Sequence, residues 1–164
     1  MFTKLVSAMV LGAVILSPAL VIGADDARSS IHIRANIPTQ QFYVQPQHPD
    51  FGKHEVMHYN PLNDDLGVLR HIFNVKNADG SIHAYIEEGR AFLSNGNTMI
   101  PLRVVFNGVR LDNIPREVVD DLSSTPGTQV EMTIRVDAMP VQHRPGYYTG
   151  DFTVIYDAVP RISA

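Results

Sequence analysis

The sequence contains no cysteine. It therefore cannot fold as a small disulfide-stapled scaffold, and it has neither a thiolate nucleophile nor a thiolate metal ligand. Its 164 residues suffice for one domain with a core of its own. We expect such a chain to be held together by burial of apolar side chains or by pairing with other chains.

Positive charge is also scarce. The 13 lysines and arginines are outnumbered by 17 aspartates and glutamates, which gives a formal net charge of −4. Nucleic acid binding relies on basic patches that neutralise phosphates. We therefore expect no nucleic acid partner.

Motifs of catalysis are missing as well. The sequence has no Gly-x-Ser-x-Gly elbow and no phosphate-binding loop. Asp64-Asp65 and Asp120-Asp121 are carboxylate pairs, but adjacent side chains point apart on a strand, and turn chemistry or helix solvation explains them better. The Tyr147-Tyr148 pair could stack on a sugar, although core packing of Tyr148 and exposure of Tyr147 is the simpler interpretation. We expect neither enzymatic activity nor a cofactor.

Histidine is comparatively abundant, with seven residues. His54 and His58 have the spacing of metal ligands on a helix. Their surroundings favour a strand, where residues four apart lie about 13 Å from each other. No cluster of acids completes a ligand set, so we expect solvated histidines and no metal site.

The first 24 residues have the pattern of a secretory signal. A short cationic start containing Lys4 precedes an apolar segment, Leu5–Leu16, and Ala24 offers a small residue at the cut. An uncleaved membrane anchor is the alternative, because residues 5–23 could span a thin bilayer. Pro18 and the polar residues that follow Ala24 favour cleavage, so no stable membrane span is expected. Without Lys4 the mature chain has a formal net charge of −5.

Beyond this leader, residues 31–37 alternate strictly between apolar and polar. Ile31, Ile33, Ala35 and Ile37 fall on one face, and His32, Arg34 and Asn36 fall on the other. This is the pattern of a half-buried strand, which Pro38 ends. By itself the pattern fits either the first strand of an ordinary sandwich or a strand that docks in another copy of the chain.

The rest of the chain reads as short strands separated by turns, which predicts an all-β antiparallel sandwich of immunoglobulin-like type. Asn77–Gly80 is predicted to form a hairpin turn that pairs the strands on either side of it. A helix is predicted only at Pro115–Leu122. The expected strands are Gln41–Val44, Val56–Tyr59, Val68–Val75, Ile82–Ile86, Met99–Phe106, Val109–Leu111, Gln129–Ala138 and Tyr148–Val159.

Three segments resemble the pilins of chaperone–usher fimbriae, in the cysteine-free alpha class typified by enterotoxigenic colonisation-factor pili. The first is the alternating strand Ile31–Ile37. The second is the Gly-aromatic-x-Gly motif at Gly146–Gly150, which runs into an alternating final strand through Tyr156. The third is Met99–Gly108, which is similar to the central strand of that family. The tail Val159–Ala164 and the segment 46–61 depart from the family pattern.

The resemblance implies a sandwich that lacks one strand and is completed by a donor strand. Residues 1–24 would be the signal peptide, 25–38 the donor extension and 39–164 the pilin domain. Identical or related pilin subunits, a periplasmic chaperone and an outer-membrane usher would be the partners, and the chain would pass through the periplasm to a surface fimbrium that supports adhesion. The inserting residues would be Ile31, Ile33, Ala35 and Ile37. The receiving groove would have Phe152, Val154 and Tyr156 as one wall and Leu102, Val104 and Phe106 as its floor.

Two other functions remain open at this point. One is a stand-alone secreted binding module, with a glycan as its candidate ligand, and the other is a secreted hydrolase of sandwich fold. The binding module predicts a monomer that folds on export alone. Activity that survives deletion of residues 25–38 would favour either of the two over a pilin.

Overall fold

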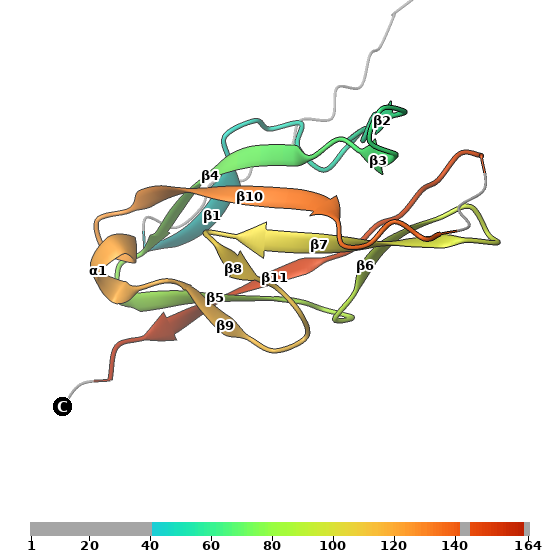
Figure 1. Ribbon diagram of the computed structural model, residues 1–164. Coiled ribbons are helices and arrows are strands. Elements are labelled where there is room, and N and C mark those ends of the chain that lie inside the picture. Colours follow the sequence, from blue (N-terminus) through green and yellow to red (C-terminus); the bar gives the residue numbers. More distant parts are fainter. Residues whose placement is uncertain (1–40, 142–144, 163–164) are drawn as a thin grey trace, which may run out of the picture. The chain divides into compact units, whose positions relative to one another are not determined.

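The computed structural model describes residues 41–141 and 145–162 (Figure 1). The chain divides into two units, Met1–Ala35 and Asn36–Ala164, and every described residue belongs to the second. These residues form an all-β antiparallel sandwich with a single short helix among them, which confirms the predicted fold class.

The larger sheet has six strands. Its order is β1-β4-β10-β7-β6, with β8 paired to β7 beside this path, and every pairing is antiparallel. The bounds are Phe42–Pro46 for β1, Leu69–Asn77 for β4, Ala91–Ser94 for β6, Met99–Phe106 for β7, Val109–Arg110 for β8 and Thr128–Val136 for β10.

The smaller sheet has three strands in the order β11-β5-β9, again antiparallel. They are β5 (Gly80–Ile86), β9 (Arg116–Val119) and β11 (Val154–Pro160). A separate two-stranded ribbon joins β2 (Tyr59–Asn60) to β3 (Asp65–Leu66), and α1 (Asp121–Ser124) follows β9.

Alternating apolar residues of the two sheets meet in one core. On β5 the side chains of Ile82 and Ala84 are fully buried, and on β10 Val130 and Met132 are nearly so. The period-2 pattern therefore identified the inward faces correctly. The strand expected at Met99–Phe106 coincides with β7.

The turn Asn77–Gly80 does not close a hairpin, contrary to the sequence prediction. β4 lies in the larger sheet and β5 in the smaller one, so the turn carries the chain from one sheet to the other. Asn77 is buried, and its side-chain nitrogen donates to the Ser81 carbonyl at 2.7 Å. Gly80 has no room for a Cβ, which would collide with the Val159 carbonyl of β11.

The predicted helix at Pro115–Leu122 is also wrong over most of its length. Arg116–Val119 forms β9, in which Val118 and Val119 are buried against the core. Branching at Cβ favours a strand over a helix at these two positions. The short helix α1 begins only after Asp120, whose side chain caps it by accepting from the Ser123 amide at 2.9 Å.

Two predicted strands have different bounds in the structure. Val56–Tyr59 is a strand only from Tyr59, so the segment holding His54 and His58 is irregular rather than extended. The final strand begins at Val154 instead of Tyr148. Before it, Thr149 forms an isolated bridge to Ser94 at the end of β6.

Candidate functional site

A cavity of about 1080 Å³ opens between the two sheets. Its walls are mainly apolar, as expected of a surface that receives an apolar partner. From the larger sheet it is lined by Leu69, Phe73, Leu93, Ile100, Leu102, Met132 and Ile134, and from β11 and the residues before it by Phe152, Val154 and Tyr156. We call this cavity the groove.

β11 borders the groove with an open edge. It is the terminal strand of its sheet, so only β5 pairs with it among the described residues (Figure 1). The Glu87 amide donates to the Thr153 carbonyl at 3.0 Å, which places the backbone groups of the odd-numbered residues on the side of β5. Because these directions alternate along a strand, the even-numbered residues direct theirs to the open edge. An open apolar edge of this kind is prone to pair with another strand.

Three aromatic rings pack together where the groove meets the closed core. Phe73 and Phe106 meet edge to face with ring centroids 5.3 Å apart, and Tyr156 lies 5.1 Å from Phe106 and 6.5 Å from Phe73. Burial raises the pKa of the Tyr156 hydroxyl well above its ordinary value. A ring so deeply packed gives this part of the groove a fixed shape.

The segment after β1 supplies one rim. The Phe51 ring lies 4.2 Å from the His71 ring and 5.4 Å from that of Phe73, by centroid distance. Glu55 Oε2 and His71 Nε2 are 3.1 Å apart, which ties this segment to β4. Residues 51–59 thereby line the groove, although they are not part of a strand before Tyr59.

The predicted acceptor residues fall into two groups. Phe152, Val154, Tyr156 and Leu102 line the groove. Val104 and Phe106 are 1% and 0% exposed and lie in the closed core beyond it. The predicted donor residues Ile31, Ile33, Ala35 and Ile37 lie outside the described residues.

Sequence reasoning did not name several groove residues, among them Leu69, Phe73, Met132 and Ile134. Their alternation marks them as inward-facing, but any core residue carries that signal. Only the topology brings the start of β4 and the end of β10 to the open end of the sandwich. The rim residue Phe51 lies in a segment whose sequence predicts a loop, and nothing in that sequence indicates that its side chain would line a groove.

The other polar candidates have structural roles. Asp64 accepts from the Tyr59 hydroxyl at 2.6 Å. Asp120 caps α1, and the Ser123 amide and hydroxyl bonded to it hold its pKa below the ordinary value. Asp121 accepts from Arg161 at 2.9 Å. These carboxylates therefore stabilise turns and helix ends.

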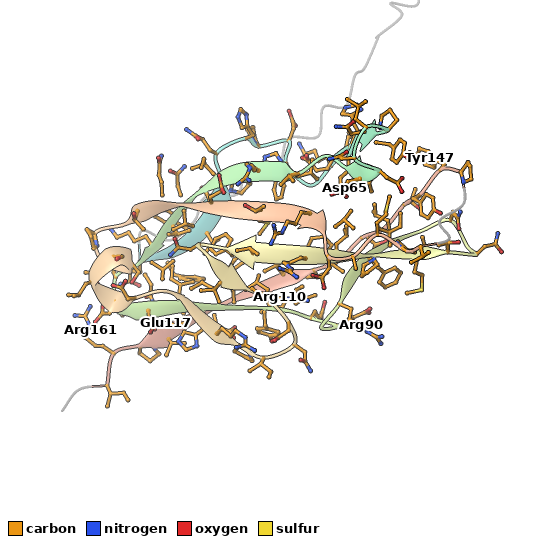
Figure 2. The ribbon with its side chains drawn as sticks, in the orientation of Figure 1. Asp65, Arg90, Arg110, Glu117, Tyr147 and Arg161 are labelled. Carbon is orange, nitrogen blue, oxygen red and sulfur yellow. The ribbon has the colours of Figure 1, made fainter. Side chains whose placement is uncertain are left out.

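Neither a metal cluster nor a membrane helix is found in the described part of the chain. Among residues 41–141 and 145–162, no three histidine or carboxylate side chains gather closely enough to hold a metal ion. Within the same residues, no helix has the length and apolar character to cross a bilayer. Tyr147, which Figure 2 labels, is 86% exposed, whereas Tyr148 is half-buried, and both line the groove.

Comparison with known proteins gives two findings. Residues 27–157 match the sequence profile of the CS1 type fimbrial major subunit family. The fold is similar to that of the CooA pilin subunit from enterotoxigenic Escherichia coli, with a TM-score of 0.54 and 18% identity over 70% of this chain and 86% of that one. No curated protein matches the chain.

Proposed function

Because the chain belongs to the CS1 type fimbrial major subunit family, we propose that its copies assemble by donor-strand exchange, each inserting residues 31–37 into the groove of the next. The chain is a structural subunit of a pilus at the cell surface, where it associates with other subunits. Its family is a structural class and not a class of enzymes.

The observation that carries the proposal is the groove beside the open edge of β11. An inserted strand would pair with that edge through main-chain hydrogen bonds, and its alternate side chains would fill the groove. Burying three isoleucines at about 1.5–3 kcal/mol each would contribute roughly 5–9 kcal/mol. The alternating residues 31–37 have the spacing that such a groove requires.

Before assembly the groove has to be protected, because an open apolar edge promotes aggregation. We propose that a periplasmic chaperone fills it after the signal peptide, residues 1–24, has been removed. The donor strand of the next subunit would then replace the chaperone at an outer-membrane usher. Each contact joins a donor segment to a groove on a different surface, so the assembly grows as a filament and does not close.

The test compares surface material sheared from cells and run on SDS gels with and without boiling. We expect the wild type to give a ladder of multimers that collapses on boiling, although the chain has no cysteine to crosslink it. Ile33→Arg should abolish the ladder, because a charge would enter the apolar groove. His32→Arg changes the opposite face of the same strand and should leave the ladder in place.

A single monomer band from the wild type under all conditions would overturn the proposal. It would indicate that residues 31–37 pair within their own subunit. A ladder of equal strength from Ile33→Arg would show instead that the subunits associate through another surface.

A further inference from the structure

The segment that ends in β11 carries two aspartates, Asp151 and Asp157, six residues apart. Asp151 is exposed and Asp157 half-buried. Neither carboxylate forms an ion pair within the described residues, although Asp157 lies opposite His83 of β5 in the ladder. Both alternate in sequence with Phe152, Val154 and Tyr156, which line the groove, and the exposed Asp151 borders the groove as well.

The outward face of the proposed donor strand carries the complementary charges at the same spacing. Arg28 and Arg34 are six residues apart, and both alternate with the apolar residues that would enter the groove. In paired strands, residues directly opposite each other point to the same face, so opposite charges there attract. The two arginines of one copy and the two aspartates of the next can therefore be matched simultaneously.

We propose that these charges set the register of the donor strand, with Arg34 opposite Asp151 and Arg28 opposite Asp157 in an antiparallel pair. This inference rests on the proposed function. It places Ile31 beside Val154, Ile33 beside Phe152, Ala35 beside Gly150 and Ile37 beside Tyr148. All four of these partners line the groove.

The extent of the groove selects the antiparallel direction. A parallel strand could also match both charge pairs, with Arg28 opposite Asp151 and Arg34 opposite Asp157. It would then place Ala35 and Ile37 beside Ala158 and Pro160. Neither residue lines the groove, which borders this segment only as far as Tyr156. The parallel arrangement would leave half of the apolar donor face outside the groove.

Shifting the antiparallel strand by two residues keeps the isoleucines on the inward face but loses the charge match. In one direction His32 would lie opposite Asp151, and in the other Asn36 would lie there. The apolar side chains alone discriminate weakly between these registers, because isoleucines recur every second residue. The charged pairs supply the discrimination.

Crosslinking reads the register directly, because the chain has no cysteine of its own. The Thr153 carbonyl accepts from the Glu87 amide just past β5, so a residue opposite Thr153 on the donor strand forms a non-hydrogen-bonded pair. Such pairs bring the Cα atoms to about 4.5 Å, which suits a disulfide. Thr153→Cys with His32→Cys leaves all four charges in place and reads the proposed register. Thr153→Cys is also combined with Ser30→Cys, which reads the parallel strand and a shift in one direction, or with Arg34→Cys, which reads a shift in the other direction.

We expect sheared filaments of the Thr153→Cys and His32→Cys pair to give a ladder that survives boiling without reductant and collapses with it. The pairs with Ser30→Cys and Arg34→Cys should give roughly fivefold less boiling-resistant multimer. An equal or stronger covalent ladder from either of those two, or none from any pair, would overturn the register. A wild type without a heat-sensitive ladder would overturn donor exchange itself, which distinguishes the two failures.

Charge reversal provides a second test that needs no new bond. Arg34→Asp should slow multimer formation roughly fivefold, because it places like charges opposite each other. Adding Asp151→Arg should restore the rate to within roughly twofold, and raising the salt concentration should weaken both effects. Failure of the second substitution to rescue the first would contradict the pairing.

Discussion

The C-terminal end of β11 is tied to its own domain by backbone and side-chain bonds, whereas its middle has an open edge. Arg161, just past the strand, donates through its amide to the Asp79 carbonyl at 2.8 Å. Its guanidinium donates to Asp121 at 2.9 Å and to Thr125 and the Ala78 carbonyl at 3.1 Å. Beside Val154, by contrast, one edge has no strand partner in the described chain. The subunit thus fixes one end of this strand with its own contacts, and the middle of the strand keeps the edge on which the proposed donor exchange depends.

The largest expected effect separates the closed core from the groove. Phe106→Ala should lower the free energy of unfolding by about 3–5 kcal/mol, because Phe106 is fully buried between Phe73 and Tyr156. Leu102→Ala, in the half-buried groove, should cost about 1–2 kcal/mol but weaken multimers more than its stability change implies. Urea unfolding of purified subunits and the SDS ladder measure the two properties. If Leu102→Ala weakened the multimers only as much as its loss of stability implies, as Phe106→Ala should, the distinction between core and groove would be lost.

A smaller loss is expected where the sheet crossover meets β11. Gly80→Ala should cost about 2–3 kcal/mol, because the new methyl group would collide with the Val159 backbone. Gly52→Ala is the matched control. It has open space around it and only the strain of its positive φ of 82°, worth about 1 kcal/mol. Thermal unfolding should rank the two variants in this order, and the reverse order would argue against the close approach.

The Arg161 contacts should contribute less to stability than the close packing at Gly80 does. Arg161→Ala should lower the free energy of unfolding by about 1 kcal/mol, because the guanidinium is half-exposed and its bonds compete with water. Arg90→Ala removes an exposed arginine with no hydrogen bond or ion pair in the described residues, so it should be close to neutral. Figure 2 shows where the two arginines lie. If both variants unfold at the same temperature, the C-terminal end of β11 is not held by its side chain.

The smallest effect concerns acid stability. The Arg103 guanidinium donates to Asp137 at 2.6 Å and, with Arg110, holds the pKa of that carboxyl below its ordinary value. A lowered pKa stabilises the fold at neutral pH, and this contribution is lost as the pH falls below about 4, through the folded-state value. Asp137→Asn should therefore be less stable than the wild type at pH 7 and approach it near pH 2 in urea titrations. If the difference in unfolding free energy between Asp137→Asn and the wild type stayed constant with pH, the carboxylate would be excluded as its cause.

The sequence predicted which faces of the strands point inward but not which strands pair. Alternation in β5 and β10 identified their buried sides because side-chain direction is a local property of the backbone. The turn Asn77–Gly80 read as a hairpin because turn chemistry is also local. Whether the chain then pairs or crosses to the second sheet depends on β11, which lies more than 70 residues further along.

The groove could be predicted in part for the same reason. Phe152, Val154 and Tyr156 were identified because the final strand alternates so clearly. On β7, Leu102, Val104 and Phe106 share one face, and the sequence gives no sign of where along that face the sandwich opens. Leu102 lies at the open part, while Val104 and Phe106 lie in the closed core.

The attachment of Arg161 has a mechanical consequence for the assembled pilus. A fimbria is stretched along its axis, and in the proposed donor-strand filament that tension would pass between each donor strand and the β11 beside it. With the two strands antiparallel, as we propose, the pull would shear their hydrogen bonds together instead of unzipping them one at a time. The guanidinium bonds from Arg161 to the Ala78 carbonyl and to Asp121 would transfer the load into the crossover and α1. Pulling single filaments should therefore rupture Arg161→Ala at lower force, and equal rupture forces would show that the load passes elsewhere.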